Sequence, residues 1–304
     1  MKIGFFTACF KNGLDLKELI KWASGQNFNA IEVACWPKNT HRRYGGKCHI
    51  DVEITPQAAG KIKDLLQLYD LEISALGYYS NNLHPDLAKR EANLSHLKKT
   101  IKAASVLGIK LVGTFVGQDP SKSIEDNLKM FTELFSDIIN YAKENNVKIM
   151  IENCPMTFSG LPGENIAYSP EVWEKMFELI PSENIGLNFD PSHLIWQGID
   201  YIKALKYFKE KIFHTHAKDT TIEKQILNKI GIYGDISKWR TDKLPGLGDI
   251  NWRKYMATLY EIGYEGIICI EHEDRMWEAN KEKIKEGLLL SKQYLSQFIM
   301  TKLK

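Results

Sequence analysis

The amino-acid sequence predicts one (β/α)8 barrel. Short runs rich in β-branched and aromatic residues alternate with longer amphipathic segments along the whole 304-residue chain, which gives eight strand–helix pairs. Strands that alternate with helices are joined by right-handed crossovers and form a parallel sheet. Eight such units in a chain of this length favour closure of the sheet into a barrel. No glycine-rich phosphate loop follows any of the runs, which argues against an open nucleotide-binding sheet.

The first four units occupy the N-terminal half of the chain. Their strands are expected over residues 2–8, 30–34, 72–78 and 110–117. Their helices are expected over residues 15–26, 57–69, 86–107 and 123–145. Asp15 stands where it can cap the first of these helices, because an aspartate there accepts hydrogen bonds from free backbone N–H groups.

The last four units follow the same rhythm, with one interruption. Their strands are expected over residues 148–153, 184–190, 211–219 and 266–273. Their helices are expected to begin near Pro170 and to span about 200–209, 252–262 and 278–298. Residues 219–249 interrupt the alternation and are expected to form a lid-like insertion at the catalytic end. They are not expected to form a second domain, so a single domain spans residues 1–304.

The composition excludes several classes of partner. Because 40 Lys and Arg are balanced by 38 Asp and Glu, the chain has no strong electrostatic preference for nucleic acid or for an anionic membrane. The five cysteines are scattered without a CxxC pair, which fits a reducing compartment. The apolar start is short and has no cleavage site, and no run approaches the roughly 20 apolar residues of a membrane helix. We therefore expect a soluble, cytoplasmic protein; the sequence leaves open whether it forms a homo-oligomer.

Four consecutive predicted strands deliver residues of the kind that bind metal ions. In a (β/α)8 barrel the C-terminal ends of the strands form the catalytic rim. A single carboxylate at a strand end is commonly a helix cap or an ion-pair partner, but four ligand-type residues in succession are poorly explained in this way. The sequence therefore predicts a site for one divalent metal ion, held by Glu152, Asp190, His216 and Glu271.

This set of side chains indicates a type of chemistry. Three carboxylates and one imidazole suit Mn²⁺, Mg²⁺ or Co²⁺ better than a thiolate-rich zinc site would, although Zn²⁺ stays open. An ion bound to a hydroxyl and a neighbouring carbonyl would stabilise an enediolate intermediate. Glu152 and Glu271 are expected on opposite sides of the substrate, where one removes a proton and the other returns it. His193 is expected to contact a substrate hydroxyl or to support a ligand, and His214 to face the barrel interior.

These motifs resemble those of the sugar phosphate isomerase/epimerase family, in the xylose-isomerase-like group of barrels that includes ketose 3-epimerases and inosose dehydratases. The matching segments are KIMIEN, NFDPSH, HTHAKD, LPGLGDINW and CIEHED, with weaker matches in LGYYSNNLHPD and TFVGQD, and the resemblance spans nearly the whole chain. The resemblance implies one divalent ion, commonly Mn²⁺, bound by Glu152, Asp190, His216 and Glu271. It also implies that the two glutamates are the acid–base pair and that His193 contacts a small, sugar-like substrate.

Two departures from the ketose 3-epimerase pattern bear on the substrate. Those enzymes have a further Glu six positions after the first metal-binding Glu, where this chain has Phe158, and an Arg shortly after the metal-binding His, which is missing here. Both departures argue against a free ketohexose. Arg240 is a candidate replacement for the missing Arg, with an exposed loop residue as the plain alternative. Lys218 is a candidate cation that faces the substrate or supports the site.

Aromatic residues near the ends of the first three strands suggest a wall for the apolar face of a sugar, although core packing explains such residues equally well. The candidates are Phe6, Phe10, Trp36 and Tyr78 or Tyr79.

The leading hypothesis is a divalent-metal-dependent isomerase or epimerase of a sugar or keto-sugar. A dehydratase or lyase of a keto-sugar or cyclitol would use the same enolate chemistry and expel hydroxide from the β-carbon. An abasic-site endonuclease, which also occurs on this barrel, would need several zinc ions, more histidines and a basic surface. A non-catalytic sugar-binding barrel would be expected to lose one of the glutamates. The substrate itself is not identified, and no phosphate cradle is visible.

Overall fold

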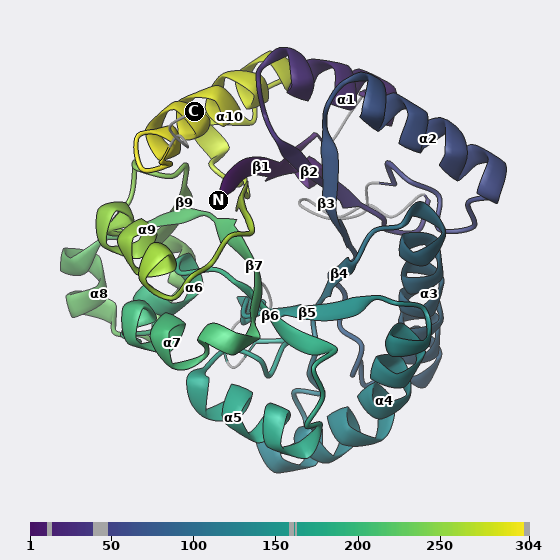
Figure 1. The fold of residues 1–304 in the computed structure, drawn as a ribbon. Coiled ribbons are helices and arrows are strands. Elements are labelled where there is room, and N and C mark those ends of the chain that lie inside the picture. Colours follow the sequence, from purple (N-terminus) through teal and green to yellow (C-terminus); the bar gives the residue numbers. More distant parts are fainter. Residues whose placement is uncertain (11–13, 39–47, 158–160, 162, 301–304) are drawn as a thin grey trace.

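The structure is a computed structural model that describes residues 1–10, 14–38, 48–157, 161 and 163–300. Eight parallel strands close into a barrel in the order β1-β10-β7-β6-β5-β4-β3-β2, and helices surround it (Figure 1). The predicted (β/α)8 barrel is therefore confirmed. The barrel strands are β1 (Lys2–Phe6), β2 (Ala30–Ala34), β3 (Glu72–Gly77), β4 (Leu111–Thr114), β5 (Lys148–Glu152), β6 (Ile185–Phe189), β7 (Ile212–Ala217) and β10 (Ile267–Ile270).

The predicted helices are found between these strands, and short polar side chains cap most of them. Asp15 and Glu18 form a reciprocal capping box at the start of the first helix, as expected for Asp15. After β6 the predicted single helix is preceded by an additional short turn of helix, α6, which carries His193. The main helices are α1 (Leu16–Gly25), α2 (Pro56–Leu68), α3 (Leu87–Leu107), α4 (Ile124–Glu144), α5 (Pro170–Leu179), α6 (Ser192–Ile195), α7 (Tyr201–Tyr207), α9 (Trp252–Glu261) and α10 (Lys281–Ser296).

Several strands end earlier than the sequence predicts. β4 ends at Thr114 and not at residue 117, and β10 ends at Ile270 and not at residue 273. Gly117 has a φ of 94°, a left-handed conformation that ends the extended run after β4. The polar residues expected at the strand ends therefore lie at the last paired residue or just beyond it, where loops carry them over the barrel mouth.

The insertion after β7 is a small antiparallel hairpin. It consists of β8 (Asp219–Ile222) and β9 (Arg240–Lys243), with α8 (Lys224–Ile230) between them at the outer edge of the molecule (Figure 1). The buried Asp219 carboxylate accepts hydrogen bonds from Gly246 N at 2.9 Å, Ile250 N at 3.0 Å and Trp252 Nε1 at 2.7 Å. This single side chain ties the LPGLGDINW segment to the end of β7.

Apolar side chains fill the space between the barrel and the helices, whereas the barrel interior holds a group of buried charged residues. Among the fully buried groups are Glu32 on β2 and His214 and His216 on β7. Burying charged groups is unfavourable unless they are paired, so their partners decide what this interior does. None of the helices within the described residues has the length and apolar character needed to cross a membrane.

Candidate active site

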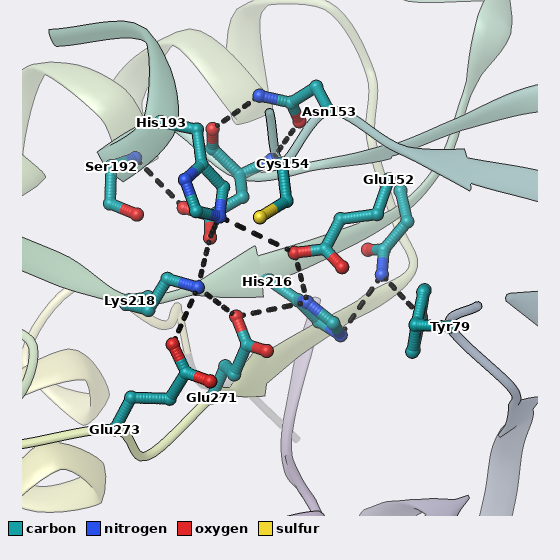
Figure 2. A network of polar contacts seen from close by, with 12 residues as sticks. Tyr79, Glu152, Asn153, Cys154, Ser192, His193, His216, Lys218, Glu271 and Glu273 are labelled. Carbon is teal, nitrogen blue, oxygen red and sulfur yellow. Dashed lines mark hydrogen bonds and ion pairs between the residues drawn. The ribbon is translucent and has the colours of Figure 1, made fainter. Parts of the chain in front are cut away.

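The four residues that the sequence predicts as metal ligands lie together at the C-terminal end of the barrel. Glu152 is the last residue of β5, Asp190 follows β6 directly, His216 lies near the end of β7, and Glu271 follows β10 directly. Since β5, β6, β7 and β10 are consecutive neighbours in the barrel, their ends bring these side chains to one place. All four are buried. Figure 2 shows Glu152, His216 and Glu271 pointing toward one another.

Two imidazoles approach this group of carboxylates, and Glu152 lies near both. His216 Nδ1 lies 3.3 Å from Glu152 Oε1 and 3.4 Å from Glu271 Oε2. His193 Nε2 lies 3.3 Å from Asp190 Oδ2 and 3.7 Å from Glu152 Oε1. Possible ligand atoms of Glu152, Asp190, His193 and Glu271 all lie within 4.8 Å of one another. The structure thus brings His193, expected from the sequence to stand outside the ligand set, as close to the carboxylates as His216.

Some buried polar atoms of this cluster make no hydrogen bond. Among the residues that the structure describes, Asp190 Oδ2 and both ring nitrogens of His193 make no hydrogen bond. The rest of Asp190 is held firmly, because Ser192 N donates to Oδ1 at 2.8 Å and Asn153 Oδ1 accepts from Asp190 N at 2.7 Å. Asp190 Oδ2 has charged neighbours at 3.3 Å, Lys218 Nζ and His193 Nε2, but makes no hydrogen bond. An oriented carboxylate with such a buried oxygen, beside two more carboxylates and an imidazole, fits a divalent cation.

Lys218, predicted to be near the substrate or in support of the site, lies inside the acidic group. Its Nζ is 2.6 Å from Glu271 Oε2, 3.2 Å from Glu273 Oε2 and 3.3 Å from Asp190 Oδ2. Only 2% of this residue is exposed. An ammonium group this deep is stable only with such partners, so Lys218 offsets part of the negative charge of the cluster.

The two candidate proton-transfer glutamates have different acidities. Burial and the negative charge of Glu271 raise the pKa of Glu152 to about 7. Burial alone would also raise the pKa of Glu271, but Lys218 and His216 hold it below its usual range. Burial, partly opposed by Lys218, raises the pKa of Asp190 to about 6. A neutral and an ionised glutamate side by side are suited to giving and taking protons.

Arg240 lies at the edge of this group and is largely buried, with 14% of its side chain exposed. Its guanidinium stacks over the ring of Trp196 at 5.4 Å and donates to Asp242 Oδ1 at 2.6 Å. Burial lowers the pKa of His193 well below its usual range, with further contributions from the charges of Lys218 and Arg240. Arg240 is therefore close enough to act on His193 electrostatically.

The candidate aromatic residues divide into two groups. Phe6 stacks on the His216 ring at 5.7 Å, Tyr79 meets the same ring edge-on at 5.8 Å, and Trp36 packs against both Phe6 and Tyr79. Phe6, Trp36 and Tyr79 thus lie beside the acidic group. Tyr78 instead donates to Asn93 Oδ1, and Phe10 packs against Phe5 and Trp22.

One buried residue next to the site did not emerge from the sequence. Glu32 lies in the middle of β2, has no exposed surface, and contacts His216 Nε2 at 2.7 Å. The available signal was a carboxylate in the otherwise apolar run AIEVA, where a charged residue inside a barrel strand needs a partner. Phe158, which replaces a Glu of the ketose 3-epimerase pattern, lies outside the described residues.

Comparisons with known proteins agree with this architecture. The inosose dehydratase of Clostridium tetani is 22% identical to this chain over 237 residues, which cover 74% of this chain and 77% of the dehydratase. A crystal structure of the IolI protein with a bound zinc atom superposes with a TM-score of 0.73 at 18% identity, covering 99% of this chain and 100% of IolI. A D-psicose 3-epimerase solved in the presence of D-fructose superposes with a TM-score of 0.73 at 16% identity, covering 98% of this chain and 99% of the epimerase.

The family model described as "Xylose isomerase-like TIM barrel" matches residues 20–294, which include all the carboxylates and histidines of the candidate site. The protein therefore belongs to the xylose isomerase-like TIM barrel family.

Proposed function

We propose that the protein is a divalent-metal-dependent isomerase or epimerase of a sugar or keto-sugar. The observation that carries this proposal is the acidic group at the barrel mouth. Two glutamates of unlike acidity, Glu152 and Glu271, face a third carboxylate, Asp190, which has a buried oxygen without a hydrogen bond. Such a pair beside a cation can remove and return a proton at a carbon next to a carbonyl.

The metal ion would be held by Glu152, Asp190, His216 and Glu271. His216 is preferred to His193 as the ligand because its second nitrogen already has a carboxylate partner, Glu32, as is usual for metal-binding histidines. The ion would polarise a substrate hydroxyl and its neighbouring carbonyl, which lowers the energy of an enediolate. The oxygen-rich ligands favour Mn²⁺, Mg²⁺ or Co²⁺, and the zinc bound by IolI makes Zn²⁺ a further candidate.

The chain's own residues supply proton transfer and substrate contacts. One of Glu152 and Glu271 removes a proton from the substrate carbon, and the other returns it from the opposite face. His193 is the residue for a substrate hydroxyl, since both its ring nitrogens are buried without hydrogen-bond partners among the described residues. Lys218 and Arg240 present positive charge on the same side.

Indole nitrogens around the acidic group also suit a polyhydroxylated substrate. Trp36 Nε1, Trp196 Nε1 and Trp239 Nε1 are buried and have no hydrogen-bond partner within the described chain. Trp36 belongs to the aromatic wall beside His216, and Trp196 lies under Arg240. Tryptophan combines an apolar face with one donor, which matches a sugar ring and its hydroxyls.

A dehydratase reaction on the same site is the second candidate, because a relative that matches three quarters of the chain is an inosose dehydratase. The same proton removal would then be followed by loss of hydroxide from the β-carbon, with an acid such as Glu152 supplying the proton that turns it into water. The two reactions differ in product mass, since only the dehydratase product is lighter by one water.

The decisive experiment is the metal content of protein purified without chelators, followed by titration with Mn²⁺. We expect about one ion per chain and its loss in Glu271→Ala. Keto-sugars and cyclitols are then screened by solvent deuterium incorporation and mass spectrometry. Two or three zinc ions per chain would favour the nuclease, and the absence of any bound metal would favour a non-catalytic barrel.

A further inference from the structure

We propose that Glu32 is a positioning residue that makes Nδ1 of His216 the nitrogen offered to the metal ion. This inference rests on the metal site proposed above and adds a residue to it that lies outside the matching segments named in the sequence analysis. Glu32 lies on β2 and His216 on β7, and β1 and β10 separate these two strands in the barrel. Glu32 Oε2 nevertheless reaches across the interior to within 2.7 Å of His216 Nε2.

The hydrogen bonds around Glu32 all run in one direction. His214 Nδ1 lies 3.0 Å from Asn188 Oδ1, and Asn188 Nδ2 donates to the Tyr79 hydroxyl at 2.8 Å. The single hydroxyl hydrogen of Tyr79 goes to Glu32 Oε1 at 2.6 Å. Each group in this row accepts from one side and donates to the other. The row therefore ends at the Glu32 carboxylate, which only accepts.

The direction of this row determines where His216 carries its hydrogen. His216 Nε2 lies 2.7 Å from Glu32 Oε2 and 3.0 Å from the amide nitrogen Nδ2 of Asn188. A ring nitrogen without hydrogen would bring two lone pairs together at the shorter, charged contact, so Nε2 donates to Glu32, and Asn188 Nδ2 donates to Tyr79 instead. A neutral imidazole has only one N–H, and with that hydrogen on Nε2 the lone pair is on Nδ1. Nδ1 is the nitrogen that faces Glu152 Oε1 at 3.3 Å and Glu271 Oε2 at 3.4 Å.

The barrel wall leaves space for this arrangement at two glycines. A Cβ at Gly77 would lie 2.8 Å from Glu32 Oε1, and a Cβ at Gly113 would lie 2.7 Å from Tyr79 Cζ. Both distances are too short for real contacts, so any larger residue would displace Glu32 or Tyr79. The Phe6 ring stacks on the face of the His216 ring, with a centroid distance of 5.7 Å and an interplanar angle of 22°.

His193 gives the contrast that makes the inference specific. Its Nε2 lies 3.3 Å from Asp190 Oδ2, on the side of the carboxylate cluster, but neither of its ring nitrogens makes a hydrogen bond within the described residues. A carboxylate on the far side of a histidine orients the ring and makes the other nitrogen a stronger donor to a metal. Only His216 has this support from Glu32.

Metal affinity tests the proposal without any need for a substrate. Dissociation constants for Mn²⁺ and Zn²⁺ are measured by competition with a chelating indicator for the wild type, Glu32→Gln and Ser74→Ala. Ser74 Oγ contacts His214 Nε2 at 3.2 Å, at the far end of the same row, and does not contact His216. We expect roughly 10- to 100-fold weaker binding in Glu32→Gln, the usual effect of losing such a partner, and unchanged binding in Ser74→Ala.

The outcomes separate this inference from the proposed function. Equal affinity of the wild type and Glu32→Gln, or equal losses in both variants, would overturn the inference while the metal site stands. A wild type that binds neither ion would overturn the metal site itself, and the inference with it.

A spectroscopic measurement on the wild type keeps the proposal testable if Glu32→Gln does not fold. In Zn²⁺-loaded protein labelled with 15N-histidine, the His216 ring signals are identified by their loss in His216→Gln. We expect a hydrogen on Nε2 and none on Nδ1. A hydrogen on Nδ1 would overturn the inference, and a merely structural role for Glu32 would not determine which nitrogen carries it.

Discussion

Two groups of buried polar side chains share His216 but differ in how completely their atoms are paired. The acidic cluster at the barrel mouth consists of Glu152, Asp190, His193, Lys218, Glu271 and Glu273. The Glu32 network, deeper in the barrel, consists of Glu32, Ser74, Tyr79, Asn188 and His214. In the acidic cluster Asp190 Oδ2 and the His193 nitrogens lack hydrogen bonds, whereas the side-chain atoms of the Glu32 network that could bind a metal are paired with one another or with His216.

The difference shows that closeness of ligand-type atoms does not by itself indicate a metal site. Glu32, His214 and Cys269 also place possible ligand atoms within 4.8 Å of one another. A metal there would have to break the hydrogen bonds from His216 and Tyr79 to Glu32, and the one between His214 and Asn188. Unpaired buried atoms are costly and paired ones are not. We therefore interpret the acidic cluster as a site for a ligand and the Glu32 network as its support.

The largest expected effect is the loss of turnover in Glu152→Gln. Removing a general acid or base typically lowers the rate by about 10²- to 10⁴-fold. The rate is measured as solvent deuterium incorporation into a substrate found by the screen. The metal-free variant should unfold at a temperature no lower than the wild type, because the substitution removes a buried carboxylate whose pKa is raised to about 7. A variant that turns over at the full rate would contradict the proton-transfer role.

The matched control lies in the Glu32 network. Asn188→Leu leaves the buried His214 Nδ1 without its acceptor, so the free energy of unfolding should fall by about 1–3 kcal/mol. Because Asn188 Nδ2 also lies 3.0 Å from His216 Nε2, metal is measured at saturating Mn²⁺, where the amount bound per chain should stay at the wild-type value. Loss of stability in Glu152→Gln with none in Asn188→Leu would reverse the roles that we assign to the two groups.

The next effect is the stability loss in Lys218→Met. The ammonium has carboxylate partners on Asp190, Glu271 and Glu273, and removing one member of a buried ion pair costs about 3–5 kcal/mol. Chemical denaturation of the metal-free protein measures this cost. The double variant Lys218→Met/Glu273→Gln should recover part of the stability, since one uncompensated carboxylate is then gone. No recovery would mean that Lys218 does not balance the charge of Glu273.

A smaller effect is expected in the pH dependence of stability. The folded metal-free protein keeps the proton of Glu152 up to about pH 7, whereas the unfolded chain releases it near the ordinary value of 4.5. The folded state then binds more protons in this window, so this contribution to stability is complete below pH 4.5 and is lost as the pH rises to about 7. Burial lowers the pKa values of His193 and His214. These two histidines bind fewer protons in the folded state, so their contribution to stability increases as the pH rises.

The contribution of Glu152 is therefore measured as a difference. Unfolding free energies of the metal-free wild type and Glu152→Gln are compared at intervals from pH 4.5 to 7.5. The wild type should lose stability relative to the variant as the pH rises. A constant difference across this range would show that Glu152 has an ordinary pKa.

The sequence predicted the architecture and the acidic cluster for the same physical reason. In a closed parallel barrel every strand ends at one rim, so Glu152, Asp190, His216 and Glu271 could be placed together from strand order alone. Strand alternation also placed His214 and His216 on the same face of β7.

The partner choices inside the barrel could not be predicted in this way. Glu32 pairs with His216 across the interior, and this depends on how the barrel closes and on the space left at Gly77. Tyr78 and Tyr79 are adjacent just after β3, where the alternation of side chains no longer applies, and only the structure shows that Tyr79 points inward. The closeness of His193 to the carboxylates likewise follows from the short helix α6 and not from a strand end.

The smallest expected effect belongs to Arg240, at the outer edge of the acidic cluster. Its guanidinium is paired with Asp242 on the same hairpin and stacks on Trp196, so neither contact is essential for the barrel. Arg240→Ala should raise KM several-fold, which corresponds to roughly 1 kcal/mol of lost substrate binding, with a change in unfolding temperature of at most a few degrees. Arg240→Lys should restore little of the loss, because an ammonium group cannot reproduce the planar stack on Trp196. Unchanged kinetics in both variants would make Arg240 an ordinary residue of the hairpin, and the positive charge that faces the substrate would then be that of Lys218 alone among the residues proposed here.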